Sequence, residues 1–121
     1  MTKITIAKTI CLTILILTLI LIIGCNKQES QGNIAPIVDA GNDLTVSVGE
    51  IFSFNGSAED LDGQIVLYEW DTDSDGIYDT SCKGCAEDSY SYEKAGIYKA
   101  RLKVTDNKGA INTDVITITV N

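Results

Sequence analysis

The chain has 121 residues, of which 45 % are hydrophobic, no histidine and a formal net charge of −8. A chain of this length holds one small domain, and its acidic balance provides no basic stripe for the phosphates of a nucleic acid. Without histidine there is no Ser-His-Asp or Cys-His arrangement, and no glycine-rich phosphate loop follows a strand. We therefore expect a protein that is not an enzyme and binds no nucleic acid.

The first 25 residues have the pattern of an export signal. An apolar run from Ile10 to Ile23 follows two lysines, and Gly24-Cys25 closes the segment. As a helix this run would be about 21 Å long, shorter than the roughly 30 Å core of a bilayer. Residues 22–25, IIGC, resemble the bacterial lipobox, after which the cysteine is acylated. We expect an N-terminal apolar signal helix over residues 1–25 and a lipid anchor on Cys25; an uncleaved N-terminal anchor is the alternative.

Residues 26–33 are polar and lack aromatic side chains, so they read as a flexible tether. A lipid anchor or an uncleaved N-terminal anchor leaves the rest of the chain outside the cytoplasmic membrane. The expected location is therefore the bacterial cell envelope, either periplasmic or exposed on the surface. The expected partner is the membrane, which the chain contacts through its lipid anchor.

Strand signals fill residues 34–121. Apolar and polar residues alternate in five segments: 44–48, 52–54, 66–70, 98–104 and 116–120. In the segment 98–104 one face is apolar, and Lys99, Arg101 and Lys103 form the other. Turns rich in Gly, Asn and Asp separate the segments, and none has helical spacing over ten residues. The pattern predicts an all-β fold, a two-sheet antiparallel β-sandwich of about seven strands.

Four short motifs carry a family resemblance. GSAEDLDG, YEWD, AGIY and VTDNKG lie between residues 56 and 109 in the order that is typical of PKD (polycystic kidney disease) domains. The resemblance covers residues 34–121 and implies an immunoglobulin-like fold of a kind common on bacterial surfaces. Within it, Tyr68 and Trp70 are expected between the sheets, and the Tyr98 hydroxyl is expected to bond to backbone at the sheet corner. The departure is the insertion in residues 68–85, where many members read simply WDFGDG.

The same resemblance implies a first metal site. In calcium-binding PKD domains, two aspartates of the S-x-x-D-x-D-G turn share one ion with the aspartate of V-T-D-N and an asparagine near the start of the domain. The matching residues here are Asp60, Asp62, Asp106 and Asn33. An ion there would stiffen the junction between tether and domain; the alternative is that these residues only cap turns.

A second candidate calcium site follows from spacing. Asp71, Asp73 and Asp75 alternate before Gly76, and Asp79 holds the ninth position, as in the first half of an EF-hand loop. The twelfth position is Cys82 rather than glutamate, and a strand, not a helix, precedes the loop. We expect weak calcium binding, in the roughly 0.1 to 1 mM range of extracellular modules. A solvated acidic turn is the alternative.

Cys82 and Cys85 form the motif S-C-K-G-C. Two thiols make half a zinc site, the chain has no histidine to complete it, and the βαβ setting of a redox pair is missing. Outside the cytoplasm, a local disulfide that staples the acidic loop is expected.

Two functions fit these features. One is an anchored binding module for another envelope protein or a polysaccharide, and the other is a structural spacer or envelope component without a specific ligand. Because a binding module needs an exposed apolar or aromatic patch, the residues to compare in the structure are Tyr78, Tyr90, Tyr92, Ile97 and Val115.

Overall fold

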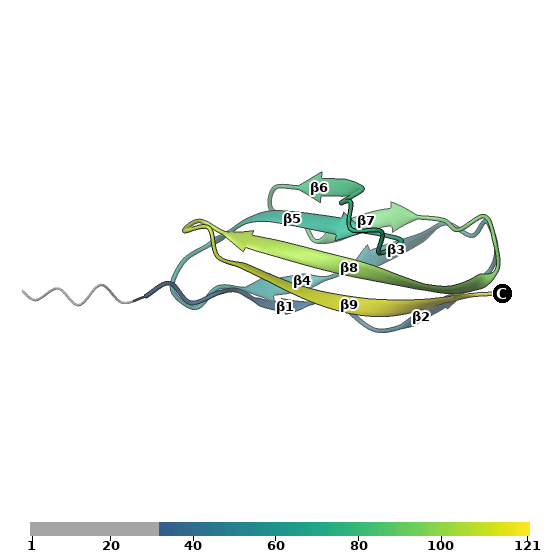
Figure 1. The fold of residues 1–121 in the computed structure, drawn as a ribbon, viewed down its shortest axis with the longest axis horizontal. Helices are drawn as coiled ribbons and strands as arrows, with labels where there is room; N and C mark the ends of the chain where they lie inside the picture. Colours follow the sequence, from purple (N-terminus) through teal and green to yellow (C-terminus); the bar gives the residue numbers. More distant parts are fainter. Residues whose placement is uncertain (1–31) are drawn as a thin grey trace, which may run out of the picture. The chain divides into compact units, whose positions relative to one another are not determined.

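The computed structural model describes residues 32–121, and all of the regular structure within that range is β-strand (Figure 1). The nine strands of this range are β1 (Ile37–Asp39), β2 (Leu44–Val46), β3 (Phe52–Asn55), β4 (Ser57–Glu59), β5 (Ile65–Asp71), β6 (Thr80–Cys82), β7 (Glu87–Tyr90), β8 (Gly96–Asp106) and β9 (Ile111–Val120). Within the same range, no helix is long and apolar enough to cross a membrane. The expected signal helix and Cys25 lie outside the described residues.

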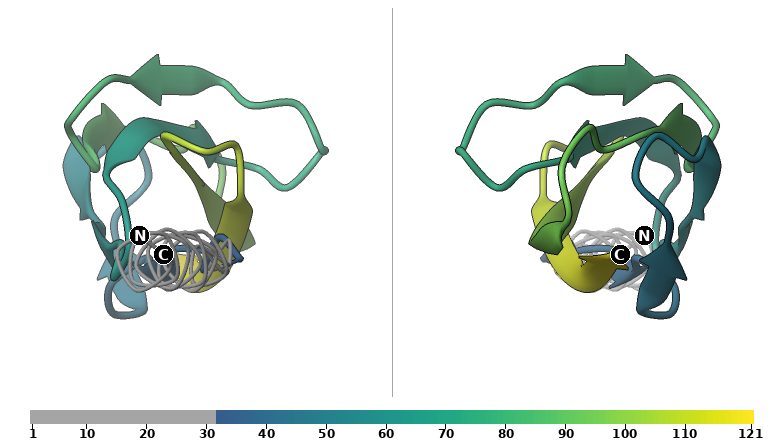
Figure 2. Two further views of the ribbon diagram at one scale, coloured as in Figure 1. Left: turned by 90° about the vertical axis from the view of Figure 1, so that its left-hand side faces the viewer. Right: turned by 90° about the vertical axis from the view of Figure 1, so that its right-hand side faces the viewer.

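The strands form a sandwich. One sheet has five strands in the order β2-β9-β8-β5-β6, and two further sheets pair β1 with β4 and β3 with β7. The end-on views in Figure 2 show these strands arranged around a common interior, with the β5–β6 loop outside it. The predicted all-β sandwich is confirmed. The expected number of about seven strands was too low, and the pairing is not antiparallel throughout, because β2 runs parallel to β9.

The longest strands, β8 and β9, form the framework of the large sheet. They pair antiparallel over ten residue pairs, from Gly96–Val120 to Thr105–Ile111. Ala100, Leu102 and Val104 are fully buried, whereas the three basic residues between and before them lie on the outer face. Alternation of apolar and charged residues therefore gives a half-buried strand with a solvated basic side, as the sequence predicts.

Aromatic side chains join the two layers. Phe54 on β3 stacks on Trp70 on β5 with ring centroids 4.6 Å apart, and the Trp70 indole donates a 3.0 Å hydrogen bond to the carbonyl of Ala86. Gly56 lies against this pair, and a Cβ at that position would approach Leu102 Cδ2 to 2.5 Å. Only glycine leaves room here for Leu102 and Trp70 to fill the core.

Two positions differ from the simple alternation in the sequence. Val66 was expected on the same face as Tyr68 and Trp70, but it is 42 % exposed. The reason is an irregularity of register between Ile65 and Leu67. At such a bulge the alternation of faces is broken, so Val66 does not share the face of Tyr68 and Trp70. Val48 was expected to continue a strand, but β2 ends at Val46 and the following turn exposes it.

Tyrosines close the core at one end. The Tyr98 hydroxyl donates a 2.9 Å hydrogen bond to the carbonyl of Lys94, which confirms the expected corner bond. The Tyr98 ring stacks on Tyr92 with centroids 4.1 Å apart. Tyr92 is only 4 % exposed, so this residue belongs to the core and cannot form part of a surface patch.

Candidate functional site

The acidic loop, residues 71–79, connects β5 to β6. Carboxylate oxygens of Asp71, Asp73 and Asp79 all lie within 4.8 Å of one another, and this is the one such group of three among the described residues. Asp71 is buried at the end of β5, whereas Asp73 and Asp79 are exposed. Asp75, which the EF-hand spacing predicts as a ligand, is not in the group. Three of the four residues that the spacing predicts therefore converge in the structure.

Hydrogen bonds hold this loop in shape. Asp79 Oδ2 accepts from the amide and the hydroxyl of Thr72, at 2.7 Å and 2.6 Å. The Thr72 hydroxyl and amide hold the pKa of Asp79 below its ordinary value, so this carboxyl stays ionised. The Asp79 amide in turn donates to the carbonyl of Trp70 at 2.8 Å, which anchors the returning end of the loop on β5.

The residues of the first predicted calcium site meet where the described chain begins. Asn33 Nδ2 donates to Asp106 Oδ2 at 2.8 Å, and the Ile34 amide donates to Asp62 Oδ1 at 3.2 Å. Asp60 Oδ1 accepts the Asp62 amide at 3.1 Å. The structure thus brings all four predicted residues into two neighbouring turns, but their carboxylates do not form a close group of three. Calcium binding here stays a prediction.

Lys108 is a partner that the sequence reasoning missed. Its ammonium donates to Asp62 Oδ2 at 2.5 Å and to the Asp62 carbonyl at 2.8 Å. This ion pair lowers the pKa of Asp62 and raises the pKa of Lys108. Burial raises the pKa of Asp106, but bonds from Asn33 and from backbone amides outweigh it, and the pKa lies below its ordinary value. The signal was present in the sequence, as the lysine of VTDNKG.

The disulfide between Cys82 and Cys85 is present, with the two Cα atoms 5.6 Å apart. The predicted local disulfide is therefore confirmed. It closes the short turn after β6, and β6 separates it from the acidic loop.

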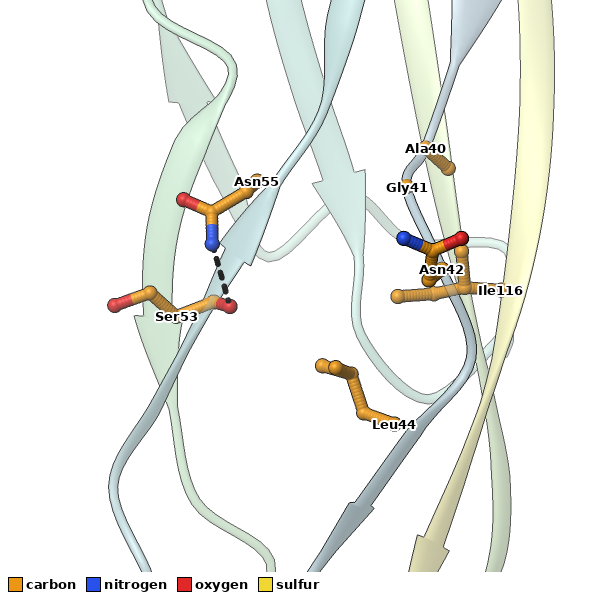
Figure 3. A pocket seen from close by; sticks show the side chains of 7 residues that line it. All are labelled: Ala40, Gly41, Asn42, Leu44, Ser53, Asn55 and Ile116. Atoms are coloured by element: carbon orange, nitrogen blue, oxygen red, sulfur yellow. Dashed lines mark hydrogen bonds between the residues drawn. The ribbon is translucent and has the colours of Figure 1, made fainter.

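A groove lies between β3 and the chain that leads into β2 (Figure 3). Its lining residues are Ala40, Gly41, Asn42, Leu44, Ser53, Asn55 and Ile116. Leu44 and Ile116 give it an apolar floor, while Asn42, Ser53 and Asn55 are exposed and supply amide and hydroxyl groups. The groove has a volume of about 150 Å³. The groove is therefore smaller than most pockets for small molecules, which are usually about 300 to 1,000 Å³.

A second, shallow depression adjoins the groove. Ile51, Ser89, Tyr90 and Ser91 line it, and the hydroxyl oxygens of Ser53 and Ser89 lie 3.4 Å apart between the two hollows. Ile51 is 78 % exposed. We call the two hollows together the β3 surface, formed by residues 40–42, 44, 51, 53, 55, 89–91 and 116. No lining residue carries a charge, although the chain as a whole is strongly acidic.

The other candidate surface residues have different roles. Tyr78 is half-buried, with the Lys103 ammonium 3.9 Å from the centroid of its ring. Ile97 and Val115 are 75 % and 40 % exposed, so both face outward as expected. Of the tyrosines considered from the sequence, Tyr90 is the one that lines a surface hollow.

A model of the PKD domain matches residues 33–120. The chain belongs to the PKD domain family. The fold agrees with a solved PKD1 domain of Vibrio anguillarum Epp, at 31 % identity and a TM-score of 0.54, covering 74 % of this chain and 98 % of that one. The predicted family resemblance is therefore confirmed.

Relatives carry this PKD domain as part of larger proteins. The pre-pro-metalloprotease PrtV of Vibrio cholerae is 43 % identical over 95 residues, which are 78 % of this chain and 10 % of the metalloprotease. A solved structure described as carbohydrate-binding modules of the β-sandwich superfamily is 32 % identical, with a TM-score of 0.58, over 74 % of this chain and 36 % of that one. The PKD domain is a non-catalytic module, and the chain spans only a tenth of the protease relative.

Proposed function

We propose that this PKD domain is a module anchored in the bacterial envelope, which binds an uncharged polymer through the β3 surface. The polymer is a polysaccharide or an uncharged segment of another envelope protein. The observation that supports this function is the composition of the β3 surface, which places amides and hydroxyls around an apolar floor without any charged lining residue.

The chemistry of this surface fits a ligand rich in hydroxyl or amide groups. Asn42 and Asn55 each offer both a donor and an acceptor, and Ser53 offers a hydroxyl that takes either role. Leu44 and Ile116 below them, with Ile51 and Tyr90 alongside, provide the apolar area that drives association. Similarity to carbohydrate-binding modules of the β-sandwich superfamily supports a polysaccharide, although that likeness covers only a third of the matched chain.

Attachment to the membrane is the second part of the proposal. The lipobox-like residues 22–25 place an acylated Cys25 only eight residues before the first residue of the family match. Two acyl chains or more are needed for stable anchoring, and the lipoprotein modification supplies them. The module then stays at the envelope, where polysaccharides and other envelope proteins are concentrated.

A single substitution tests the binding surface. Ser53→Arg adds a bulky charge to an exposed position between the two hollows, and Thr113→Arg adds the same group to an exposed position on β9 outside them. The full chain is applied to insoluble polysaccharides and to immobilised envelope proteins. We expect one class of material to retain the unmodified chain. Ser53→Arg should be retained at least about tenfold more weakly, which corresponds to a loss of about 1.4 kcal/mol of binding free energy. Thr113→Arg should be retained as well as the unmodified chain.

A structural spacer is the second candidate function. It is favoured by the packing of most aromatic side chains against one another inside the sandwich. These are Phe52, Phe54, Trp70, Tyr92 and Tyr98. If the chain is retained by neither polysaccharide nor protein, this function replaces the binding module.

A further inference from the structure

The acidic loop contains a buried carboxylate that a solvated turn does not explain. Asp71 is 0 % exposed, and its Oδ1 atom has no hydrogen-bond partner among the described residues. The other oxygen, Oδ2, accepts one bond, from the Gly76 amide at 3.1 Å. Burying an ionised carboxylate with one oxygen that has no hydrogen bond costs folding free energy, unless a cation compensates the charge.

Within residues 32–121, no basic side chain forms an ion pair with Asp71. The ion pairs among the described residues join Lys103 to Glu69 and Lys108 to Asp62. Arg101 is opposite Asp71 in the register of β5 and β8, but these two residues form no ion pair. A cation that compensates this carboxylate would therefore have to come from solution.

The loop gathers oxygen ligands around this position. Oxygens of Asp73 and Asp79 lie within 4.8 Å of an oxygen of Asp71, and both residues are exposed, so an ion can reach them from solvent. Oxygen ligands without nitrogen or sulfur select hard cations. Calcium accepts six to eight oxygens in irregular geometry, whereas magnesium demands a nearly ideal octahedron of ligands. Three carboxylates from one irregular loop fit the geometry of calcium better.

We propose that Asp71, Asp73 and Asp79 bind one calcium ion, with water and backbone carbonyls as the remaining ligands. Asp75 is outside this set, contrary to the EF-hand spacing. The site is distinct from the turns of Asp60, Asp62 and Asp106, and it does not depend on the function of the β3 surface. Its effect is to neutralise the buried Asp71 and to hold the acidic loop against β5.

Two neighbouring aspartates form a matched pair for the test. Asp73 and Asp75 are both exposed, and the Oδ1 atom of each accepts the amide two residues further on, at 3.1 Å and 2.7 Å. Asparagine keeps that bond in both positions. The variants Asp73→Asn and Asp75→Asn therefore differ in whether the lost charge faces Asp71.

Calcium binding to the full chain, in a non-ionic detergent, is measured by titration calorimetry, and folding of each variant is verified by circular dichroism. We expect saturable binding at roughly 0.1 to 1 mM. Asp73→Asn should weaken it at least about tenfold, a loss of about 1.4 kcal/mol of binding free energy, and Asp75→Asn by less than about threefold. Asp60→Asn, in the other turn, should leave this affinity unchanged.

Three results would overturn the proposal. They are the absence of saturable binding by the folded chain, an equal loss in Asp73→Asn and Asp75→Asn, and a loss of binding in Asp60→Asn with full affinity in Asp73→Asn. A calorimetric titration with magnesium adds a second criterion, because binding as tight as that of calcium would contradict the irregular oxygen site inferred here.

Discussion

Tyr92 shows how one side chain joins the core to the acidic loop. Its ring stacks on Tyr98 in the interior, and its hydroxyl donates a 2.5 Å hydrogen bond to the carbonyl of Thr72 in the loop. Burial raises the pKa of Tyr92 far above its usual value of about 10, because the phenolate would lose its hydration. The orientation of the loop therefore depends on a neutral hydroxyl inside the sandwich.

Removing this hydroxyl should destabilise the domain. Tyr92→Phe keeps the ring and leaves the Thr72 carbonyl without its donor, so we expect a loss of about 1 to 2 kcal/mol in the free energy of unfolding measured with urea. Tyr78→Phe serves as the control, because Tyr78 is half-buried outside the core, and its effect should stay within about 0.5 kcal/mol. Equal losses in the two variants would show that the hydroxyl of Tyr92 has no special role.

Acid should weaken the fold through three aspartates. The pKa values of Asp62, Asp79 and Asp106 are lowered in the folded chain. A lowered pKa contributes stability that is present above the unfolded value of about 3.9 and is lost as the pH falls through the folded value. We expect urea stability to fall below about pH 4 and Asp106→Asn to reduce that fall. A fall of the same size in Asp106→Asn would exclude Asp106 as a contributor.

At the scale of elements, the β5–β6 connection is the most distinctive part of the chain. The disulfide between Cys82 and Cys85 closes the turn after β6, and the Asp79 amide bonds back to the Trp70 carbonyl. In the unfolded chain this covalent loop restricts the residues between the two cysteines, which follow β6 and do not include the acidic loop.

Reducing the disulfide should have a modest effect. The entropy model for a loop this short gives about 2 kcal/mol, so we expect Cys82→Ala/Cys85→Ala to lose no more than that in urea unfolding and to remain folded. Free-thiol labelling of the unreduced, mature protein provides the independent measurement and should find neither Cys82 nor Cys85 reactive. Labelling of both thiols in the unreduced chain would contradict the bond.

The sequence predicts some of these elements well and others poorly, for physical reasons. Strands β8 and β9 are evident because their alternate residues are buried in one core. The parallel pairing of β2 is not evident, because alternation records which face is buried but not which strand lies alongside. The convergence of Asp71 with Asp79, but not Asp75, depends on the loop backbone, where Ser74 and Gly76 have positive φ angles of 57° and 91°.

The two proposed sites were not equally visible either. Alternating aspartates marked the acidic loop directly. The β3 surface had no such motif, because Asn42, Ser53 and Asn55 come from separate segments that only the fold brings together. The turn sequence around Asn55 predicted a bend but not a groove.

At the scale of the whole molecule, the proposed lipid anchor on Cys25 precedes a small β-sandwich. Cys25→Ser should abolish labelling by a radioactive fatty acid in a bacterial host and should release the domain from the membrane fraction. Acylation is the expected attachment, because the apolar run before Cys25 is too short to span a bilayer comfortably. A variant that stays in the membrane fraction without label would support an uncleaved N-terminal anchor.

The claim that the β3 surface binds a polymer is tested most directly by photo-crosslinking in intact cells. A photoreactive amino acid is placed at Ser53 in one full-length chain and at Thr113 in another, since both positions are exposed on strands. The account predicts an adduct of higher mass from position 53 and none from position 113. No adduct from position 53, or equal adducts from both, would contradict it.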